Sequence, residues 1–247
     1  MKFHVMTLFP EMFSSYMDHS IMKRALDNGV FEFEAINIRD YSTNKHKKVD
    51  DYPFGGGAGM VMPPQPIYDC FKKIEENLTS KKPRVIYLTP KGQTFNQKMA
   101  EDLSKEEELI FLCGHYEGVD QRILDMIVTD EISLGDFVLT GGELPTLTMI
   151  DAIVRLLPGA LGCEESFQDE SFSSGLLEYP QYTRPREFLG QEVPQVLLSG
   201  NHKNIDTWRR QKSIEITHER RPEIIDETTF SKKEKEFYYN LKKSCKK

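Results

Sequence analysis

Glycines end several short apolar stretches of this sequence, and such places can hold a ligand. Residues 132–145 read ISLGDFVLTGGELP, in which a strand-like run breaks at Gly141 and Gly142 before a helical pattern begins. Glycine between a strand and a helix lets backbone N–H groups approach a ligand closely. The competing interpretation is a Gly-Gly turn of purely structural use.

Two upstream stretches have the same form. Residues 84–92 read RVIYLTPKG, and residues 108–118 read ELIFLCGHYEG. The carboxyl ends of parallel strands lie at one edge of a sheet, and α/β folds bind ligands in the crevice there. The three stretches together predict one ligand-binding crevice.

Two charged features have open interpretations. Asp151 and Arg155 stand one helical turn apart, so they form either a surface ion pair or a pair with the guanidinium at a cleft. Residues 39–62 contain a basic cluster at 45–48 and a glycine-rich run, without the Gly-Lys-Ser/Thr ending of an NTPase loop. A segment of this kind is either functional or a mobile surface loop.

The C-terminal third is rich in basic residues that lie near tyrosines and a tryptophan. Arginine and lysine beside aromatic rings suit contacts with phosphates and bases, while a solvated helix face is the alternative. The basic residues are Arg184, Arg186, His202, Lys203, Arg209, Arg210, Lys212, Arg220 and Arg221.

The elements needed to position these groups alternate between strands and helices. This order predicts an α/β fold with a mostly parallel sheet and helices on both faces. The predicted strands are 2–8, 31–38, 84–88, 108–113 and 131–134, and the predicted helices are 10–26, 63–78, 96–103, 119–127 and 145–157. The pattern dissolves at 158–179, which predicts a linker, and helices are predicted again at 203–218 and 230–247.

The composition argues against membrane-spanning, zinc-binding and disulfide-rich proteins. The chain has 247 residues, 38% of them hydrophobic and 29% charged, with a net charge of −7. No apolar run is long enough to span a membrane, and the first residues lack a cleavable signal pattern. The four cysteines are scattered, which argues against a zinc site or a disulfide framework and predicts a cytoplasmic protein.

The sequence resembles the bacterial tRNA (guanine-N1)-methyltransferases over nearly its whole length. The motifs that carry the resemblance occur in the expected order: TLFPEMF, VDDYPFGGGAGMVM, VIYLTPKG, LCGHYEGVDQR, SLGDFVLTGGELP, LLPG, YTRP, EVPQVLLSGNH and RRPE.

This resemblance implies an enzyme that methylates ring nitrogen 1 of the tRNA guanosine immediately 3′ of the anticodon, with S-adenosylmethionine as methyl donor. It implies a SPOUT-class α/β domain with a trefoil knot at residues 1–162, a flexible linker at 163–179 and a small helical tRNA-binding domain at 180–247. It also implies a homodimer with an active site shared between chains, and assistance by Mg²⁺, for which the sequence shows no recognisable ligand set.

When the family's functional residues are carried over one by one, the resemblance implies catalytic, cofactor-binding and tRNA-binding residues in this sequence. Glu117 would recognise the guanine edge, and Arg155 would stabilise negative charge on the reacting ring. The expected cofactor-binding residues are Tyr87, Leu88, Thr89, Pro90, Gly114, Leu134, Gly135, Phe137, Val138, Leu139, Gly141, Gly142 and Pro145. The expected tRNA-binding residues are Arg184, His202, Arg209, Arg210 and Arg220.

The sequence departs from the family at one catalytic position. The family has an aspartate before Ser-Phe as general base, whereas this chain has Glu170 before Ser171 and Phe172, with Asp169 one residue earlier. We expect Glu170 to be the base, with Asp169 as the alternative. The change favours one alternative, a tRNA-binding protein that has lost its chemistry. A methyltransferase of the same fold with a different substrate is a third possibility.

Overall fold

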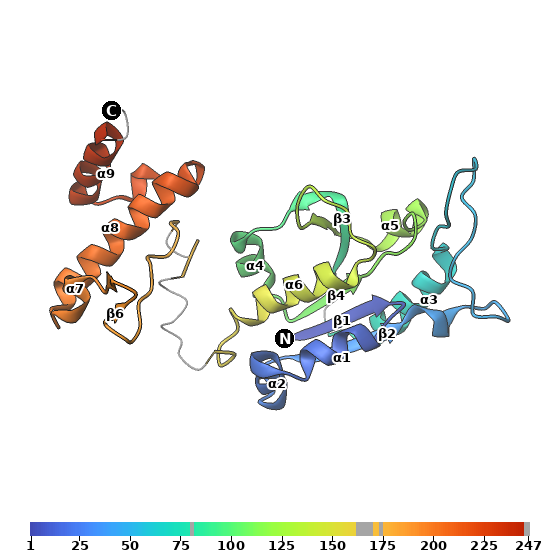
Figure 1. Cartoon of the computed structure of the whole chain (residues 1–247). Helices are drawn as coiled ribbons and strands as arrows, with labels where there is room; N and C mark the ends of the chain where they lie inside the picture. The colour runs from blue at the N-terminus through green and yellow to red at the C-terminus, as the bar shows by residue number, and fades with distance from the viewer. Residues whose placement is uncertain (80–81, 162–169, 173–174, 245–247) are drawn as a thin grey trace. The chain divides into compact units, whose positions relative to one another are not determined.

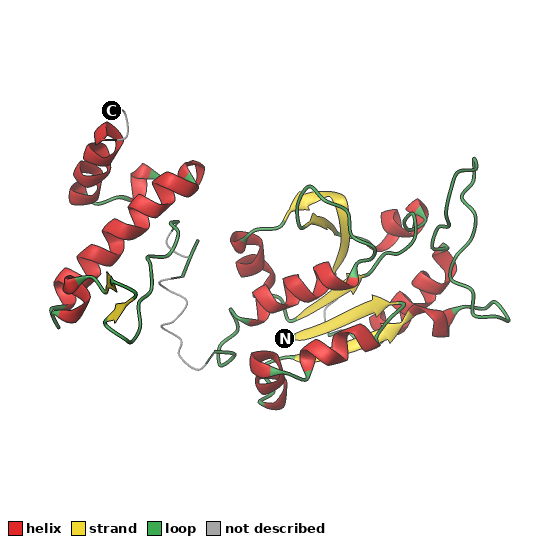
Figure 2. Cartoon of the chain, viewed as in Figure 1, coloured by secondary structure: helices red, strands yellow, loops and turns green. Residues whose placement is uncertain are grey.

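The computed structural model describes residues 1–79, 82–161, 170–172 and 175–244. The chain divides into two compact units, Met1–Glu164 and Glu165–Lys247. Strands and helices alternate in the first unit, and the second is mainly helical (Figure 2). No helix in the described residues is long and apolar enough to cross a membrane.

A five-stranded sheet forms the centre of the first unit, in the order β2-β1-β4-β3-β5 (Figure 1). Every neighbouring pair in this sheet is parallel, which confirms the predicted α/β architecture. The strands are β1 (Lys2–Thr7), β2 (Glu32–Asn37), β3 (Arg84–Thr94), β4 (Glu108–Leu112) and β5 (Asp130–Ser133).

Helices cover both faces of the sheet. One apolar cluster joins the strands to the first set of helices: α1 (Glu11–Met17), α2 (Ser20–Asp27), α4 (Gln97–Leu103) and α6 (Glu143–Val154). A second cluster joins the opposite face to α3 (Pro64–Glu75) and α5 (Gln121–Ile127). Alternate residues of β4 divide between the clusters, with Phe111 in the first and Leu112 in the second, because successive side chains of a strand point to opposite faces.

Helix starts follow local capping chemistry. Asn96 caps α4 by accepting a hydrogen bond from the Met99 amide, and Asp120 caps α5 by accepting one from the Arg122 amide. Asparagine and aspartate are favoured there because their side chains satisfy amides that have no partner within the helix. The structure therefore begins α5 two residues later than the predicted start at 119.

Two elements differ from the sequence-based expectation. The single helix expected at 10–26 is two helices, because His19 is extended, with φ −129° and ψ 152°, and separates α1 from α2. The strand expected at 84–88 continues to Thr94, and its pairing with β5 shifts between Leu88 and Gln93.

The glycine-rich segment 39–62 extends away from the sheet and returns to it (Figure 1). A short 3-10 helix, Ile38–Tyr41, comes first, and an antiparallel bridge between Asp51 and Val61 closes the base of a loop. Phe54 lies in this loop with its side chain 99% exposed. Met62 then pairs with Val119, which ties the segment to the loop after β4.

The second unit is built around α8 (His202–Arg220) and α9 (Lys232–Ser244). Its apolar core contains Leu176, Ile214, Phe230 and Tyr238. The sequence did not predict its short elements, β6 (Glu187–Phe188), β7 (Gln191–Glu192) and α7 (Gln195–Leu198).

Part of the expected linker 163–179 is packed on the helical unit. The Leu177 amide donates to the Thr217 hydroxyl on α8 at 2.9 Å, and the Phe172 amide donates to the Leu176 carbonyl at 2.8 Å. The described residues 170–172 and 175–179 therefore differ from an extended connection. Residues 163–169 and 173–174 of that expected linker lie outside the described residues.

Candidate active site

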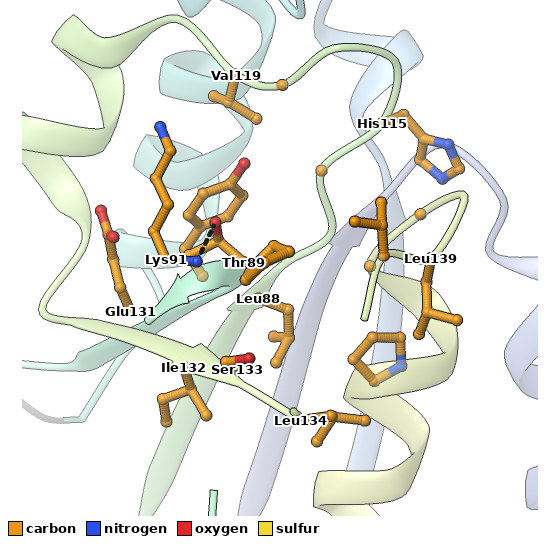
Figure 3. Close-up of a pocket in the computed structure, with 18 of the residues that line it drawn as sticks. Leu88, Thr89, Lys91, His115, Val119, Glu131, Ile132, Ser133, Leu134 and Leu139 are labelled. Carbon is orange, nitrogen blue, oxygen red and sulfur yellow. Dashed lines mark hydrogen bonds between the residues drawn. The ribbon is translucent and has the colours of Figure 1, made fainter. Parts of the chain in front are cut away.

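A pocket of about 410 Å³ lies at the carboxyl ends of β3, β4 and β5 (Figure 3). Its walls come mainly from the three glycine-containing stretches singled out in the sequence, which lie within β3, after β4 and at the end of β5. A volume of this size is typical of small-molecule sites. The predicted crevice at the sheet edge is thus present.

All but one of the residues expected to bind the cofactor line this pocket. The exception is Gly135, which does not belong to the described lining but packs against Phe137. The expected residues that line the pocket are Tyr87, Leu88, Thr89, Pro90, Gly114, Leu134, Phe137, Val138, Leu139, Gly141, Gly142 and Pro145.

The shift in β3 shapes one wall of the pocket. Between the two parts of the strand, Thr89 and Lys91 line the pocket, and the Lys91 amide donates to the Thr89 hydroxyl at 3.3 Å. Gly92 then lies so close to the backbone of Glu131 and Ile132 that a Cβ atom there would overlap with it. Glycine at 92 therefore lets the chain leave β5 and pair with it again.

Gly141 and Gly142 line the pocket, but the structure gives a different reason for their lack of side chains. A Cβ atom on Gly141 would lie 2.6 Å from His115 Nε2, and one on Gly142 would lie 2.7 Å from the Cα atom of Cys113. These glycines are required for packing between two loops. The expectation that the pair also lets backbone approach a ligand stays a prediction.

Glu117 lines the pocket from the loop after β4, and its side chain is exposed. The Glu117 amide donates to the Met60 carbonyl at 2.9 Å. Gly59 has φ +82°, and a Cβ atom there would overlap with the Glu117 side chain. The glycine-rich segment therefore contacts the carboxylate expected to recognise guanine, which supports the functional interpretation of that segment over a purely solvated loop.

Several pocket residues were not identified from the sequence. Lys91, His115, Tyr116, Glu131 and Ser133 all belong to the lining. Each stands within or directly beside a quoted motif or strand end, so position relative to a strand end was the available signal. Burial raises the pKa of Tyr87, and the nearby Glu131 carboxylate adds to the increase, so its hydroxyl is a neutral hydrogen-bonding group in the pocket.

Arg155 does not belong to the described pocket lining. Arg155 is half-buried and ends α6, and its amide donates to the Asp151 carbonyl. The Asp151 carboxylate accepts a hydrogen bond from the Tyr16 hydroxyl at 2.9 Å. Burial and this hydrogen bond raise the pKa of Tyr16 to about 12. Glu170 is half-buried in the second unit, and Asp169 lies outside the described residues.

The expected tRNA-binding residues are in the second unit. Arg184, His202 and Arg220 are exposed, whereas Arg209 is half-buried with its guanidinium 4.9 Å from the centre of the Tyr179 ring. Arg210 forms an ion pair of 2.6 Å with Glu234 on α9. Burial alone would raise the pKa of Glu234, but hydrogen bonds from Ser231 and Arg210 lower it. Arg210 therefore also joins two helices.

Comparison with known proteins agrees with the motifs. A family model described as tRNA (Guanine-1)-methyltransferase TrmD matches residues 1–227. The tRNA (guanine-N(1)-)-methyltransferase of Clostridioides difficile (strain 630) is 67% identical over 221 residues, covering 90% of this chain and 96% of that protein. The protein of the same name from Alkaliphilus metalliredigens (strain QYMF) is 59% identical over 244 residues, covering 98% of this chain and 99% of its own.

A further protein of that name, from Clostridium perfringens (strain SM101 / Type A), is 61% identical over 234 residues and is covered over 97% of its length. These matches include the three glycine-containing stretches that form the pocket. The pocket, the parallel sheet and the extent of the match lead to one conclusion: the chain belongs to the tRNA (guanine-1)-methyltransferase family.

Proposed function

We propose that the protein transfers a methyl group from S-adenosylmethionine to ring nitrogen 1 of the guanosine immediately 3′ of the anticodon in tRNA. The observation that carries the proposal is the pocket at the ends of β3, β4 and β5, which is lined by the motifs of the matched family. The activities printed for the relatives support the same substrate class.

The pocket suits a cofactor of this kind. S-adenosylmethionine supplies the methyl group when bound. The backbone of residues 88–90 and 139–142 offers donors and acceptors at the pocket wall, and Leu88, Leu134 and Pro145 offer apolar contacts. Such a mixture is typical of sites that bind small molecules with a few fixed polar contacts.

Each expected catalytic residue has a proposed task at the guanine. The Glu117 carboxylate accepts hydrogen bonds from guanine N–H groups, since an ionised carboxylate is an acceptor. The Arg155 guanidinium stabilises negative charge on the ring as its proton leaves. Glu170 takes that proton, and Asp169 is the alternative base.

Binding of tRNA is proposed for the second unit. Arg184, His202, Arg209, Arg210 and Arg220 would contact phosphates of the anticodon stem, a task that positive side chains perform without reading sequence. We propose 1–162 as the catalytic domain, 163–179 as a linker whose last residues pack on the helical unit, and 180–247 as the tRNA-binding domain. The family resemblance supports these boundaries.

The remaining proposals concern the whole protein. We propose a trefoil knot around the pocket, a homodimer with shared active sites, and a cytoplasmic location. Besides the family resemblance, the knot is supported by close contact between the loops after β4 and before α6, where the Gly142 amide donates to the Gly114 carbonyl at 3.0 Å.

Magnesium is also expected from the resemblance. Within the described parts of the chain, no group of three or more His, Cys, Asp or Glu side chains is arranged to hold a metal ion. Those residues do not fit a metal site, so no chemical step is assigned to the ion. Activity after treatment with EDTA, and again after Mg²⁺ is restored, tests the expectation.

Methyl transfer to defined RNA tests the main proposal. The full chain is incubated with tritiated S-adenosylmethionine and a tRNA transcript that has guanosine 3′ of the anticodon. We expect label in this transcript and none in a transcript with adenosine at that position. Equal labelling of the two transcripts would refute the proposed site of methylation.

Glu170 in place of the family's aspartate favours one rival function, a tRNA-binding protein without catalysis. The same transcript distinguishes the two. Binding of the transcript by the folded protein, without transfer of label in a single turnover at saturating S-adenosylmethionine, would support the rival.

A further inference from the structure

A buried carboxylate joins three segments beside the pocket. Glu143 is the first residue of α6, and it is 1% exposed. Its Oε1 atom accepts a hydrogen bond of 2.6 Å from the Thr7 hydroxyl at the end of β1. Its Oε2 atom lies 2.7 Å from Nε2 of His115, in the loop after β4. None of these residues has a task in the proposed reaction.

A backbone amide determines which groups donate and which accept in this chain of hydrogen bonds. The Phe9 N–H donates to the Thr7 oxygen at 2.9 Å, and an amide N–H can only donate. The Thr7 hydroxyl therefore directs its own proton to Glu143. Carboxylate oxygens accept hydrogen bonds, so we infer that the proton in the 2.7 Å contact with Glu143 Oε2 lies on His115 Nε2.

The His115 ring also contacts the opposite loop. A Cβ atom on Gly141 would overlap with the ring, so the imidazole lies directly on the Gly141 backbone. The Phe9 ring packs against the imidazole, with centroids 4.9 Å apart at an angle of 64°. Residues 114–118 and 139–142 both line the pocket, and Figure 3 shows His115 and Leu139 as members of these two loops.

We propose that His115 is a positioning residue for the cofactor pocket, held in one tautomer and one orientation by Glu143 and Thr7. In that orientation the ring keeps the loop 139–142 against the loop 114–118 and so sets the shape of the wall that they share. The assignment of the cofactor rests on the proposed function. The tautomer and the contact between the loops do not.

The tautomer is tested first, because it can be observed without activity. The full chain is labelled with ¹⁵N-histidine, and the ring nitrogen shifts of His115 are measured at pH 7.5. We expect the proton on Nε2. In Glu143→Gln, the amide oxygen still accepts from Thr7, so the amide NH₂ faces His115 and the ring proton moves to Nδ1. The same tautomer in both proteins, or a wild-type ring protonated on Nδ1 or on both nitrogens, would overturn the proposal.

Cofactor affinity forms the second arm of the test. Because a charge-assisted hydrogen bond is lost, we expect His115→Ala and Glu143→Gln each to weaken binding of S-adenosylmethionine by about tenfold in calorimetry. The kcat for methyl transfer at saturating cofactor should change less than the KM for the cofactor. The double variant should be no weaker than either single variant, since both remove one contact.

Two controls separate positioning from general damage. His115→Gln can still donate toward Glu143 and should recover part of the affinity. His19→Ala, at an exposed position between α1 and α2, should bind as the wild type does. Thermal unfolding shows that each variant is folded. Unchanged affinity in folded His115→Ala, or additive losses in the double variant, would contradict the proposed task. Failure of the wild-type protein to bind S-adenosylmethionine would instead refute the proposed cofactor and leave the tautomer result valid.

Discussion

His4 is a buried histidine between two glutamates of the neighbouring strands. It lies on β1 at 2% exposure, and neither ring nitrogen has a hydrogen-bond partner within the described residues. Burial lowers the pKa of His4, and the positive Lys2 lowers it further, while Glu34 and Glu108 on the neighbouring strands partly oppose the change. The ring is therefore neutral at pH 7, and its approaches of 3.4 Å to Glu34 and 3.9 Å to Glu108 are not ion pairs.

This pKa predicts how stability depends on pH. The unfolded chain takes up a proton at His4 near pH 6.5 and the folded chain only at lower pH, so the free energy of unfolding falls as the pH falls below about 6.5. One proton contributes at most about 1.4 kcal/mol per pH unit. Urea unfolding between pH 7.5 and 5.5 measures the slope, which His4→Leu should reduce.

The exposed His46 provides the control for this measurement. His46→Ala should leave the slope as in the wild type. Equal slopes in His4→Leu and the wild type would show that His4 does not resist protonation in the folded protein.

The identity of the general base is a second prediction at the scale of single residues. Glu170 occupies the family position before Ser171 and Phe172. Loss of a general base typically slows a reaction by roughly 10²- to 10⁴-fold, and we expect Glu170→Gln to lower the single-turnover rate by that amount. Asp169→Asn should cost far less. The reverse order of the two effects would identify Asp169 as the base.

At the scale of elements, the arginines of the second unit are predicted to differ in their contributions. Arg184 and Arg220 are exposed, so each can release counterions from a tRNA phosphate. Arg184→Ala and Arg220→Ala should each reduce the salt slope of tRNA binding by about one. Filter binding over a range of salt concentrations measures the slope.

Arg210 is the matched comparison, because its charge is engaged by Glu234. Arg210→Ala should mainly lower the thermal stability of the second unit, with a smaller change in salt slope. Identical slopes for Arg184→Ala, Arg220→Ala and the wild type would mean that these arginines only face solvent.

The strands were largely predictable from sequence because each is a short apolar run between glycine, proline or charged residues. The second part of β3 was not, because Pro90 and Gly92 indicate a loop locally. Residues 93 and 94 become strand only because Gly92 lets the backbone approach Glu131 and Ile132. The break at His19 was missed because buried apolar residues, Met17 and Met22, continue across it.

The pocket was predictable as a set of strand ends, since each wall belongs to one continuous motif. Contacts between motifs were not. His115 and Glu143 meet because Gly141 has no side chain, and β4 and α6 bring them together from separate stretches of sequence. Nothing in the local pattern of either stretch specifies that pair. The sequence likewise gave no sign that Gly59 makes room for Glu117.

At the scale of the whole molecule, the proposed shared active site can be tested by combining two different variant chains in one dimer. Glu117→Gln and Glu170→Gln are each expected to be far slower than the wild type. A mixed dimer with one chain of each variant is purified through two different tags. If each site takes Glu117 from one chain and Glu170 from the other, one site carries both changes and the other carries neither. Activity should then return to about half that of the wild type.

If each site is formed within one chain, both sites of the mixed dimer carry one change. Activity then stays as low as in the separate variants, which would exclude a shared site. Analytical ultracentrifugation of the wild-type protein, whose chain mass is 28.6 kDa, tests dimer formation itself.

The order of the strands in the sheet has a consequence for how the protein folds. Every neighbouring pair is parallel, and β4 lies between β1 and β3. No pair can therefore form from a tight hairpin, and sheets made of distant contacts fold slowly. During synthesis at about 5–20 residues per second, β1 and β2 wait for seconds before β4 emerges to cover the open edge of β1. While the chain is being synthesised, the unpaired edge of β1 is thus a place where the nascent protein can aggregate.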